Sequence, residues 1–177
     1  IPDGERVPDV QLRDADGQAV QLGDLVATGP ILLVFYRGGW CPYCNFQVHG
    51  LTEGFPEFQR RGVTPVMVSV DRMEEAVKTR ATYTIPFPVL SDPDLSAHTA
   101  FRVVHFADDA EVARLSSFGL DIERASGKDH HQFAVPSMFV IDGTGLVRWS
   151  HADPDYKVRP SLIQVLAAID GLGLSVD

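Results

Sequence analysis

The hydrophobic positions of the chain gather in two runs, an uninterrupted one at residues 31–36 and a second at residues 65–70 that contains a single polar residue, Ser69. Runs of this length without alternating polar positions are typical of strands that are covered on both faces. We expect residues 31–36 to form the centre of a β-sheet and residues 65–70 to form a parallel neighbour. The segment between them predicts a helix that starts near Pro42, because its apolar side chains recur at helical spacing. Gly54 and Pro56 should interrupt it.

Alternating patterns around turn residues predict two β-hairpins, one near each end of the chain. The first joins residues 10–12 to residues 19–22 through the turn Asp-Ala-Asp-Gly. The second joins residues 137–141 to residues 146–150 through Asp-Gly-Thr-Gly. The last predicted element is a helix over residues 160–170, whose apolar side chains form one stripe.

Two acidic positions predict further helix starts. The Asp71 carboxylate is placed to cap a helix, because Glu74 follows three residues later and completes a capping pattern. Asp92 and Pro93 predict the start of a short helix that runs to about Ala100.

The pattern weakens in an insert at residues 103–135. Within it, residues 107–118 are compatible with a helix, and residues 121–132 are polar and predict a loop. The alternation of strands and helices elsewhere indicates an α/β fold. A chain of 177 residues fits one domain, which we expect to span residues 1–177.

Composition and charge exclude several classes of partner. The net charge is −9 and the isoelectric point about 5.0, so the protein should repel the phosphates of nucleic acids and anionic lipid headgroups. The apolar run at residues 31–36 is far shorter than the roughly 20 residues that span a bilayer. We therefore expect no nucleic acid and no membrane as partner. Cytoplasmic localisation is expected, although the sequence starts at Ile1 and its N-terminus gives no evidence on compartment.

The chain has two cysteines, Cys41 and Cys44, spaced Cys-Pro-Tyr-Cys after a predicted central strand. This spacing indicates a redox dithiol. Pro42 favours the first position of a helix, which makes Cys41 the N-cap and places its sulfur at the positive end of the helix dipole. That position lowers a thiol pKa and predicts an exposed, attacking Cys41. Cys44 lies one turn further on the apolar stripe and should be the resolving partner.

Two other roles for the cysteine pair are weaker. A disulfide between residues three apart closes a loop too small to stabilise the fold much. A structural zinc site needs about two further ligands. The chain has no second cysteine pair, and its six histidines show no His-x₃₋₅-His spacing. We expect neither a metal nor a cofactor. His130 and His131 are expected to be solvated residues of the insert.

The motif around the cysteines resembles the active site of the alkyl hydroperoxide reductase and thiol-specific antioxidant family, in its peroxiredoxin-like branch within the thioredoxin superfamily. Residues 35–44 read Phe-Tyr-Arg-Gly-Gly-Trp-Cys-Pro-Tyr-Cys. Weaker similarities follow in the family's order over nearly the whole chain, at residues 8–9, 16–17, 70–71, 90–94, 135–142 and 152–156. The resemblance implies a thioredoxin-like fold, with a central mixed β-sheet flanked by helices, an extra N-terminal hairpin and an insert before a cis-proline strand.

The resemblance also implies further site residues. Trp40, directly before the cysteine motif, should border the substrate surface, and Pro136 should be the cis-proline that faces the cysteines. Arg37 and Arg148 are the candidates for the family's catalytic arginine. The acid that assists the second cysteine in thioredoxins would fall at Phe35, which cannot transfer a proton, so another proton acceptor is needed.

The family pattern and the helix position disagree on which cysteine attacks. Peroxiredoxins carry a threonine or serine three residues before the peroxidatic cysteine, and this alignment puts Cys41 in the threonine place and Cys44 in the peroxidatic place. Thioredoxins instead attack with the first cysteine of the pair. We favour Cys41 for disulfide substrates and leave Cys44 open for peroxides.

The resemblance implies a thiol-dependent antioxidant oxidoreductase that reduces hydroperoxides through a Cys41–Cys44 dithiol and disulfide cycle. A thioredoxin-like protein disulfide reductase and a non-catalytic redox-sensing binding module are the alternatives. The substrate would then be a hydroperoxide or a protein disulfide, and the electron donor a thioredoxin-like protein or a small thiol. The resemblance is also compatible with a homodimer.

Overall fold

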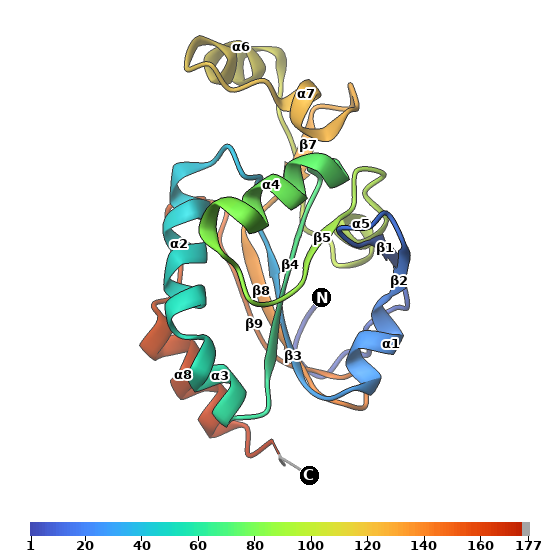
Figure 1. Ribbon diagram of the computed structural model, residues 1–177, viewed down its shortest axis with the longest axis vertical. Helices are drawn as coiled ribbons and strands as arrows, with labels where there is room; N and C mark the ends of the chain where they lie inside the picture. The colour runs from blue at the N-terminus through green and yellow to red at the C-terminus, as the bar shows by residue number, and fades with distance from the viewer. Residues whose placement is uncertain (175–177) are drawn as a thin grey trace.

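A central sheet of seven strands organises the protein, whose computed structural model describes residues 1–174 (Figure 1). The strand order is β2-β1-β5-β4-β3-β8-β9. The strands are β1 (Gln11–Arg13), β2 (Ala19–Gln21), β3 (Ile31–Phe35), β4 (Thr64–Ser69), β5 (Val89–Ser91), β8 (Ser137–Ile141) and β9 (Val147–Ala152). Strand β3 runs parallel to β4 and antiparallel to β8, so the sheet is mixed, as expected.

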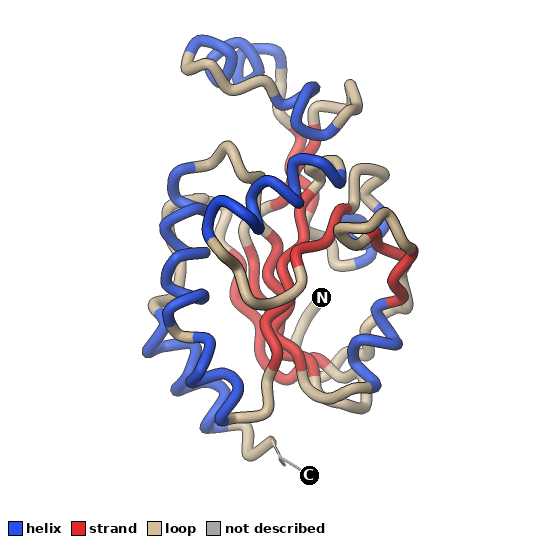
Figure 2. Tube along the Cα trace, viewed as in Figure 1, coloured by secondary structure: helices blue, strands red, loops and turns tan. Residues whose placement is uncertain are grey.

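Helices cover both faces of this sheet (Figure 2). They are α1 (Leu22–Ala27), α2 (Pro42–Glu53), α3 (Phe55–Arg60), α4 (Met73–Tyr83), α5 (Ser96–Ala100) and α8 (Leu162–Gly171). Side chains of α2, α3, α4 and α8 pack against one face of β3, β4 and β8, and side chains of α1 and α5 pack against the other. This double cover explains why β3 and β4 consist almost entirely of buried residues.

Both predicted hairpins and the crossover between the two central strands are confirmed. The N-terminal hairpin is formed by β1 and β2, and the second hairpin by β8 and β9. Glu53 ends α2 and Phe55 begins α3, so the helix is interrupted at Gly54 as the sequence indicates. Strand β4, and not β3, occupies the middle of the sheet. Among residues 1–174, no helix has both the length and the hydropathy needed to cross a membrane.

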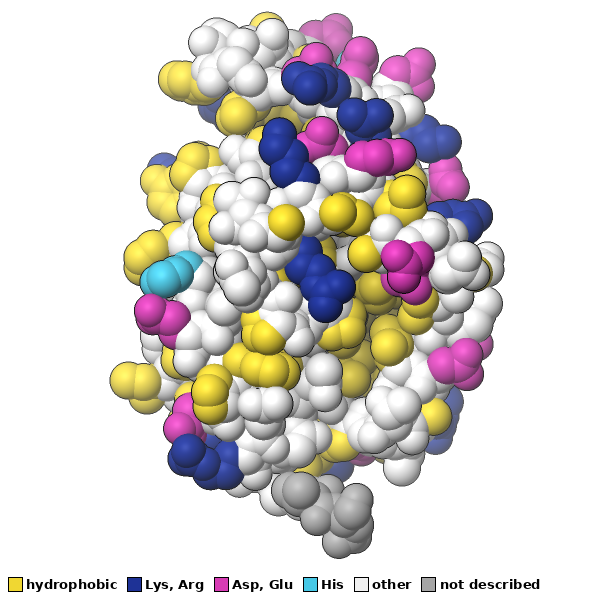
Figure 3. All heavy atoms as spheres, viewed as in Figure 1, with side chains coloured by type: hydrophobic (Ala, Val, Ile, Leu, Met, Phe, Trp, Pro, Cys, Tyr) yellow, Lys and Arg dark blue, Asp and Glu magenta, His cyan; other side chains and the backbone are white. Residues whose placement is uncertain are grey.

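The insert folds as a separate layer at one end of the sheet (Figure 1). It contains β6 (Val104–Phe106), α6 (Asp109–Ser117), α7 (Ile122–Ser126) and β7 (Gln132–Ala134), and β6 pairs with β7 in a two-stranded ribbon. The helix predicted at residues 107–118 is confirmed, whereas the predicted loop at 121–132 is wrong in part, because it contains α7. Charged side chains gather over the insert and its junction with α4 (Figure 3).

Two predicted caps and the cis-proline are wrong. The N-cap of α4 is Arg72, because the Asp71 carboxylate turns instead to the backbone N–H of Gly39. Helix α5 starts at Ser96, although Asp92 does accept hydrogen bonds from its first turn. The bond before Pro136 is trans, as is every peptide bond among residues 1–174. Val135 bonds to Val103 and the chain continues directly into β8, so the trans form, which X–Pro bonds prefer, fits this extended path.

Candidate active site

The loop between β3 and α2 brings the cysteines to the carboxyl end of a central strand. Cys41 is the N-cap of α2 and Pro42 its first residue, as the sequence predicts. The Cys41 N–H bonds to the Gly38 carbonyl at 3.1 Å, and the Gly39 N–H bonds to Asp71 Oδ2 at 2.8 Å. A side chain at Gly38 would collide with Trp40 and Asp71, so glycine is required there for the close approach of the loop.

Both sulfurs are buried, which corrects the prediction of an exposed Cys41. Cys41 and Cys44 are free thiols, and neither is exposed at all. The guanidinium of Arg37 accounts for part of this cover, because its Nη1 lies 3.9 Å from Cys41 Sγ and the residue is only 6% exposed. A substrate must therefore pass the side chains that cover the sulfurs, and Arg37 is one of them.

Three aromatic rings hold Arg37 in place. Its guanidinium carbon lies 5.1 Å from the ring centre of Trp40, 5.0 Å from that of Phe133 and 4.1 Å from that of Tyr156. Such contacts stabilise a cation over the ring faces. Trp40 packs edge to face on Phe133, so it supports Arg37 and also belongs to the apolar core of the insert.

The two thiols have opposite pKa shifts because they share one proton. The pKa of Cys41 is lowered to about 6, first by the hydrogen bond from the Cys44 thiol and further by the Cys44 backbone N–H, Arg37 and Arg159, against the effect of burial. The Cys44 N–H faces this sulfur without forming a regular capping hydrogen bond. Burial raises the pKa of Cys44 well above its ordinary value, and the adjacent Cys41 raises it further. At neutral pH the charge therefore resides on Cys41 and the proton on Cys44.

Arg159 is a site residue that the sequence did not reveal. Its Nη2 donates to Cys44 Sγ at 3.2 Å, its Nη1 donates to Gln47 Oε1 at 2.8 Å, and its Nε donates to the Tyr156 carbonyl at 2.9 Å. The residue lies between β9 and α8, more than a hundred positions after the cysteines, and no local pattern marks it. The Arg37 backbone N–H also points to Cys44 Sγ, at 3.4 Å.

Asp71 and Tyr36 form a second buried polar group beside the cysteine loop. Asp71 is 1% exposed, and its Oδ1 and the Tyr36 hydroxyl have no hydrogen-bond partner among residues 1–174. Burial raises the pKa of Asp71 to about 7, although the Gly39 N–H opposes the shift. Burial also raises the pKa of Tyr36, and the nearby Asp71 carboxylate raises it further. The sequence pattern predicts Asp71 as a helix cap and not as a site residue. Its position directly after a buried strand is the sequence signal that would have indicated a site residue.

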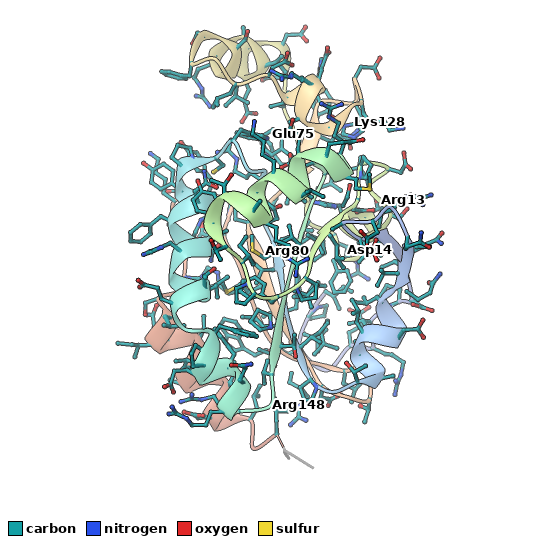
Figure 4. All side chains as sticks on the ribbon, viewed as in Figure 1. Arg13, Asp14, Glu75, Arg80, Lys128 and Arg148 are labelled. Atoms are coloured by element: carbon teal, nitrogen blue, oxygen red, sulfur yellow. The ribbon has the colours of Figure 1, made fainter. Side chains whose placement is uncertain are left out.

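The remaining candidate residues from the sequence analysis differ in their distance from the two cysteines. Pro136 lines a small cavity together with Arg37 and Tyr156, so it lies at the site despite its trans bond. Arg148 does not, because it bonds to Asp142 at 3.1 Å at the end of the sheet near the C-terminus (Figure 4). His130 and His131 bond to the Pro93 carbonyl and to Glu123. Within residues 1–174, no cluster of three or more His, Cys, Asp or Glu side chains is arranged to hold a metal.

Solved structures share this fold along nearly the whole chain. Peroxidoxin BcpB from Mycobacterium tuberculosis matches with a TM-score of 0.75 at 20% identity, covering 97% of both chains. Reduced Prx3 from Vibrio vulnificus, solved in complex with H2O2, matches with a TM-score of 0.79 at 17% identity, covering 96% of both chains. At these identities the similarity establishes the fold.

Curated relatives match over part of their length. The 1-Cys peroxiredoxin PER1 of Triticum aestivum is 27% identical over 143 residues, which cover 76% of this chain and 64% of that protein. The thiol-disulfide oxidoreductase ResA of Bacillus cereus is 31% identical over 90 residues, covering 50% of this chain and 51% of that protein. This chain thus spans only 64% and 51% of the length of these two relatives. The sequence profile of the AhpC/TSA family matches residues 4–150, and the chain therefore belongs to the AhpC/TSA family.

Proposed function

We propose that the protein is a thiol-dependent oxidoreductase that reduces hydroperoxides with Cys41 and Cys44. The observation that carries this proposal is the pKa of Cys41, which is lowered to about 6 beside the Arg37 guanidinium. At neutral pH this sulfur is largely a thiolate, which is the nucleophilic form. The membership in the AhpC/TSA family supports the same activity.

The two thiols together supply the two electrons that reduce the hydroperoxide. The Cys41 thiolate attacks the terminal oxygen of the hydroperoxide, the O–O bond breaks, and the alcohol or water leaves after taking up a proton. Cys41 is then a sulfenic acid. The Cys44 thiol attacks this sulfur, the Cys41–Cys44 disulfide forms, and the hydroxyl leaves as water with the Cys44 proton. A thioredoxin-like protein or a small thiol then reduces the disulfide.

Three groups of the chain assist these steps. Arg37 stabilises the Cys41 thiolate and the negative charge that develops on the departing oxygen. Arg159 donates to Cys44 Sγ and stabilises this sulfur as it loses its proton. Asp71, whose pKa of about 7 suits proton exchange at neutral pH, lies beside the loop that carries Cys41.

A surface groove favours protein disulfide reduction as the second candidate. The groove has a volume of about 710 Å³ and runs along α2 and the start of α8, next to Arg159. Tyr43 and Phe46 line it and are 46% and 82% exposed. An apolar groove of this size beside a redox pair suits a polypeptide segment of a disulfide-bonded partner or of an electron donor. Homodimer formation and cytoplasmic localisation remain predictions from the sequence.

The experiment that separates the two candidates compares oxidants for the reduced protein. We expect hydrogen peroxide to oxidise the thiols, followed by tryptophan fluorescence in stopped flow, faster than the disulfides of insulin do at equal concentration. Faster reaction with insulin would assign the protein to disulfide exchange. Absence of both reactions would leave a redox-sensing role and contradict either enzyme activity.

A further inference from the structure

The insert contributes two side chains to the surroundings of Arg37. Glu111, on α6, places its Oε1 3.9 Å from Arg37 Nη2, and its Oε2 lies 2.7 Å from Nε2 of His105, on β6. The His105 ring packs on Phe133, one of the three rings that hold Arg37, with centroids 5.1 Å apart. The guanidinium therefore lies between the Cys41 sulfur on one side and the Glu111 carboxylate on the other.

A small cavity lies at this junction. It has a volume of about 150 Å³, and its wall includes Arg37, His105, Glu111, Phe133, Pro136 and Tyr156. Two strands and one helix of the insert region thus meet the cysteine loop here. The wall is polar where Arg37, Glu111 and His105 meet and apolar elsewhere.

The volume and the polar groups of the cavity determine which ligands it can bind. Drug-sized ligands occupy pockets of roughly 300–1,000 Å³, so this cavity takes only a small molecule. A hydroperoxide presents acceptor oxygens and one O–H donor, which match the N–H groups of Arg37 and the carboxylate of Glu111. Cys41 is not part of the wall. Because the Arg37 guanidinium contacts Cys41 Sγ at 3.9 Å, a molecule bound to Arg37 in the cavity is separated from the attacking sulfur by this one side chain.

We propose that this cavity is the entry site for hydrogen peroxide and short-chain hydroperoxides, and that Glu111 of the insert sets the size limit and positions Arg37. This inference rests on the proposed function. Glu111 faces the cationic Arg37, the exposed Arg114 at 3.9 Å and His105, so its charge is balanced at the site. The insert thereby acts as the specificity element of the enzyme.

The test compares the reactions of two peroxides with the parent protein and with variants of two similar Glu–His pairs of the insert, Glu111–His105 and Glu123–His131. Glu111→Ala opens the cavity and removes the carboxylate, whereas Glu111→Gln keeps the shape and removes the charge. The control is Glu123→Ala, because Glu123 forms a similar pair with His131 at 2.6 Å on the same insert. Rate constants for thiol oxidation are measured with hydrogen peroxide and with cumene hydroperoxide.

We expect the parent and the Glu123→Ala protein to prefer hydrogen peroxide by about 10-fold or more, because a cavity wall discriminates by steric fit. Glu111→Ala should reduce this preference to about 3-fold or less, by slowing hydrogen peroxide and admitting the cumyl group. Glu111→Gln should slow both peroxides by about 10-fold and keep the preference, because it loses a charged hydrogen-bond acceptor.

Two results would overturn the inference in distinguishable ways. If the parent reacts with peroxides but Glu111→Ala keeps the same preference as Glu123→Ala, the cavity is not the entry site, while the peroxidase function stands. If the parent reacts with neither peroxide and still reduces disulfides, the proposed function and this inference both fail.

Discussion

At the scale of single residues, the chemistry depends on one proton shared by two sulfurs. The Cys44 thiol is the largest cause of the lowered Cys41 pKa, ahead of the arginines. Cys44→Ala removes this donor, whereas Cys44→Ser keeps an O–H donor at the same place. We expect the pH midpoint for alkylation of Cys41 to rise by about one pH unit or more in Cys44→Ala, toward the ordinary pKa of about 8.5, and to stay near the parent value in Cys44→Ser.

The measurement is the rate of iodoacetamide alkylation at Cys41 as a function of pH, with the modified peptide identified by mass spectrometry. In the parent, reactivity should fall as the pH drops through about 6, because protonation removes the thiolate. Equal midpoints in both variants would show that the helix terminus and the arginines, and not Cys44, stabilise the anion.

Asp71 gives a second prediction at this scale, for stability as a function of pH. Its pKa is raised to about 7 in the folded protein, so folding takes up a proton there at intermediate pH. The carboxyl of the unfolded chain has its ordinary pKa of about 4. The stability that the protonated Asp71 contributes is therefore present in full below about pH 4, decreases as the pH rises from about 4 to about 7, and is lost above that. Asp71→Asn should therefore be more stable than the parent at pH 8 by about 4 kcal/mol, and nearly equal to it near pH 4.

Urea denaturation of both proteins at several pH values measures this difference. Asparagine keeps an oxygen for the Gly39 N–H, so the loop geometry is preserved. A stability difference that does not change with pH would mean that Asp71 is not protonated on folding.

Residues of the site were predictable only where the signal was local. Cys41, Cys44, Arg37 and Trp40 lie within one short motif, and the N-cap position followed from Pro42. Arg159 reaches Cys44 from a distant irregular segment, which no spacing rule connects to the cysteines. The burial of Cys41 was also unpredictable, because Arg37, which lies against its sulfur, is held there by aromatic rings of distant segments.

At the scale of elements, the start of α8 fixes the segment that carries Arg159. Ser161 caps this helix: its Oγ accepts from the Gln164 N–H at 3.2 Å, and the Gln164 side chain accepts from the Ser161 N–H at 2.8 Å. Ser161→Ala should lower the free energy of unfolding by about 1 kcal/mol, because loss of an N-cap costs that much.

The matched control is Ser116→Ala, the same change on the exposed side of α6, where no cap is lost. It should be neutral or slightly stabilising, since alanine has the higher helix propensity. Thermal or urea denaturation of both variants measures the difference. Equal effects would show that the capping box of α8 contributes nothing to stability.

Elements were predictable where they are long and apolar. Strands β3, β4 and β8 and helices α2 and α8 follow from their periodicity, since burial dictates their residue types. Strands β6 and β7 are three residues each and pair across the whole insert, so neither has a pattern of its own. The cis-proline prediction failed because it rested on the resemblance alone, whereas the local chain path is extended.

At the scale of the whole molecule, the sheet, the cysteine loop and the insert converge on one place. The loop after β3 carries Arg37 and the cysteines, the residues after β4 include Asp71, and the segment after β9 carries Arg159. The insert covers this end of the sheet and adds Glu111. Because both cysteines are buried, access to them depends on the groups that surround them.

The central claim is that Cys41 attacks the peroxide and Cys44 resolves. The most direct measurement is stopped-flow oxidation of the reduced protein by hydrogen peroxide, with the product of each cysteine variant identified by mass spectrometry. Cys44→Ser should react and stop with one oxygen atom added to Cys41, and Cys41→Ser should react at least about 100-fold more slowly, because burial keeps Cys44 protonated. A sulfenic acid that forms on Cys44 of the Cys41→Ser protein as fast as the parent reacts would contradict the account.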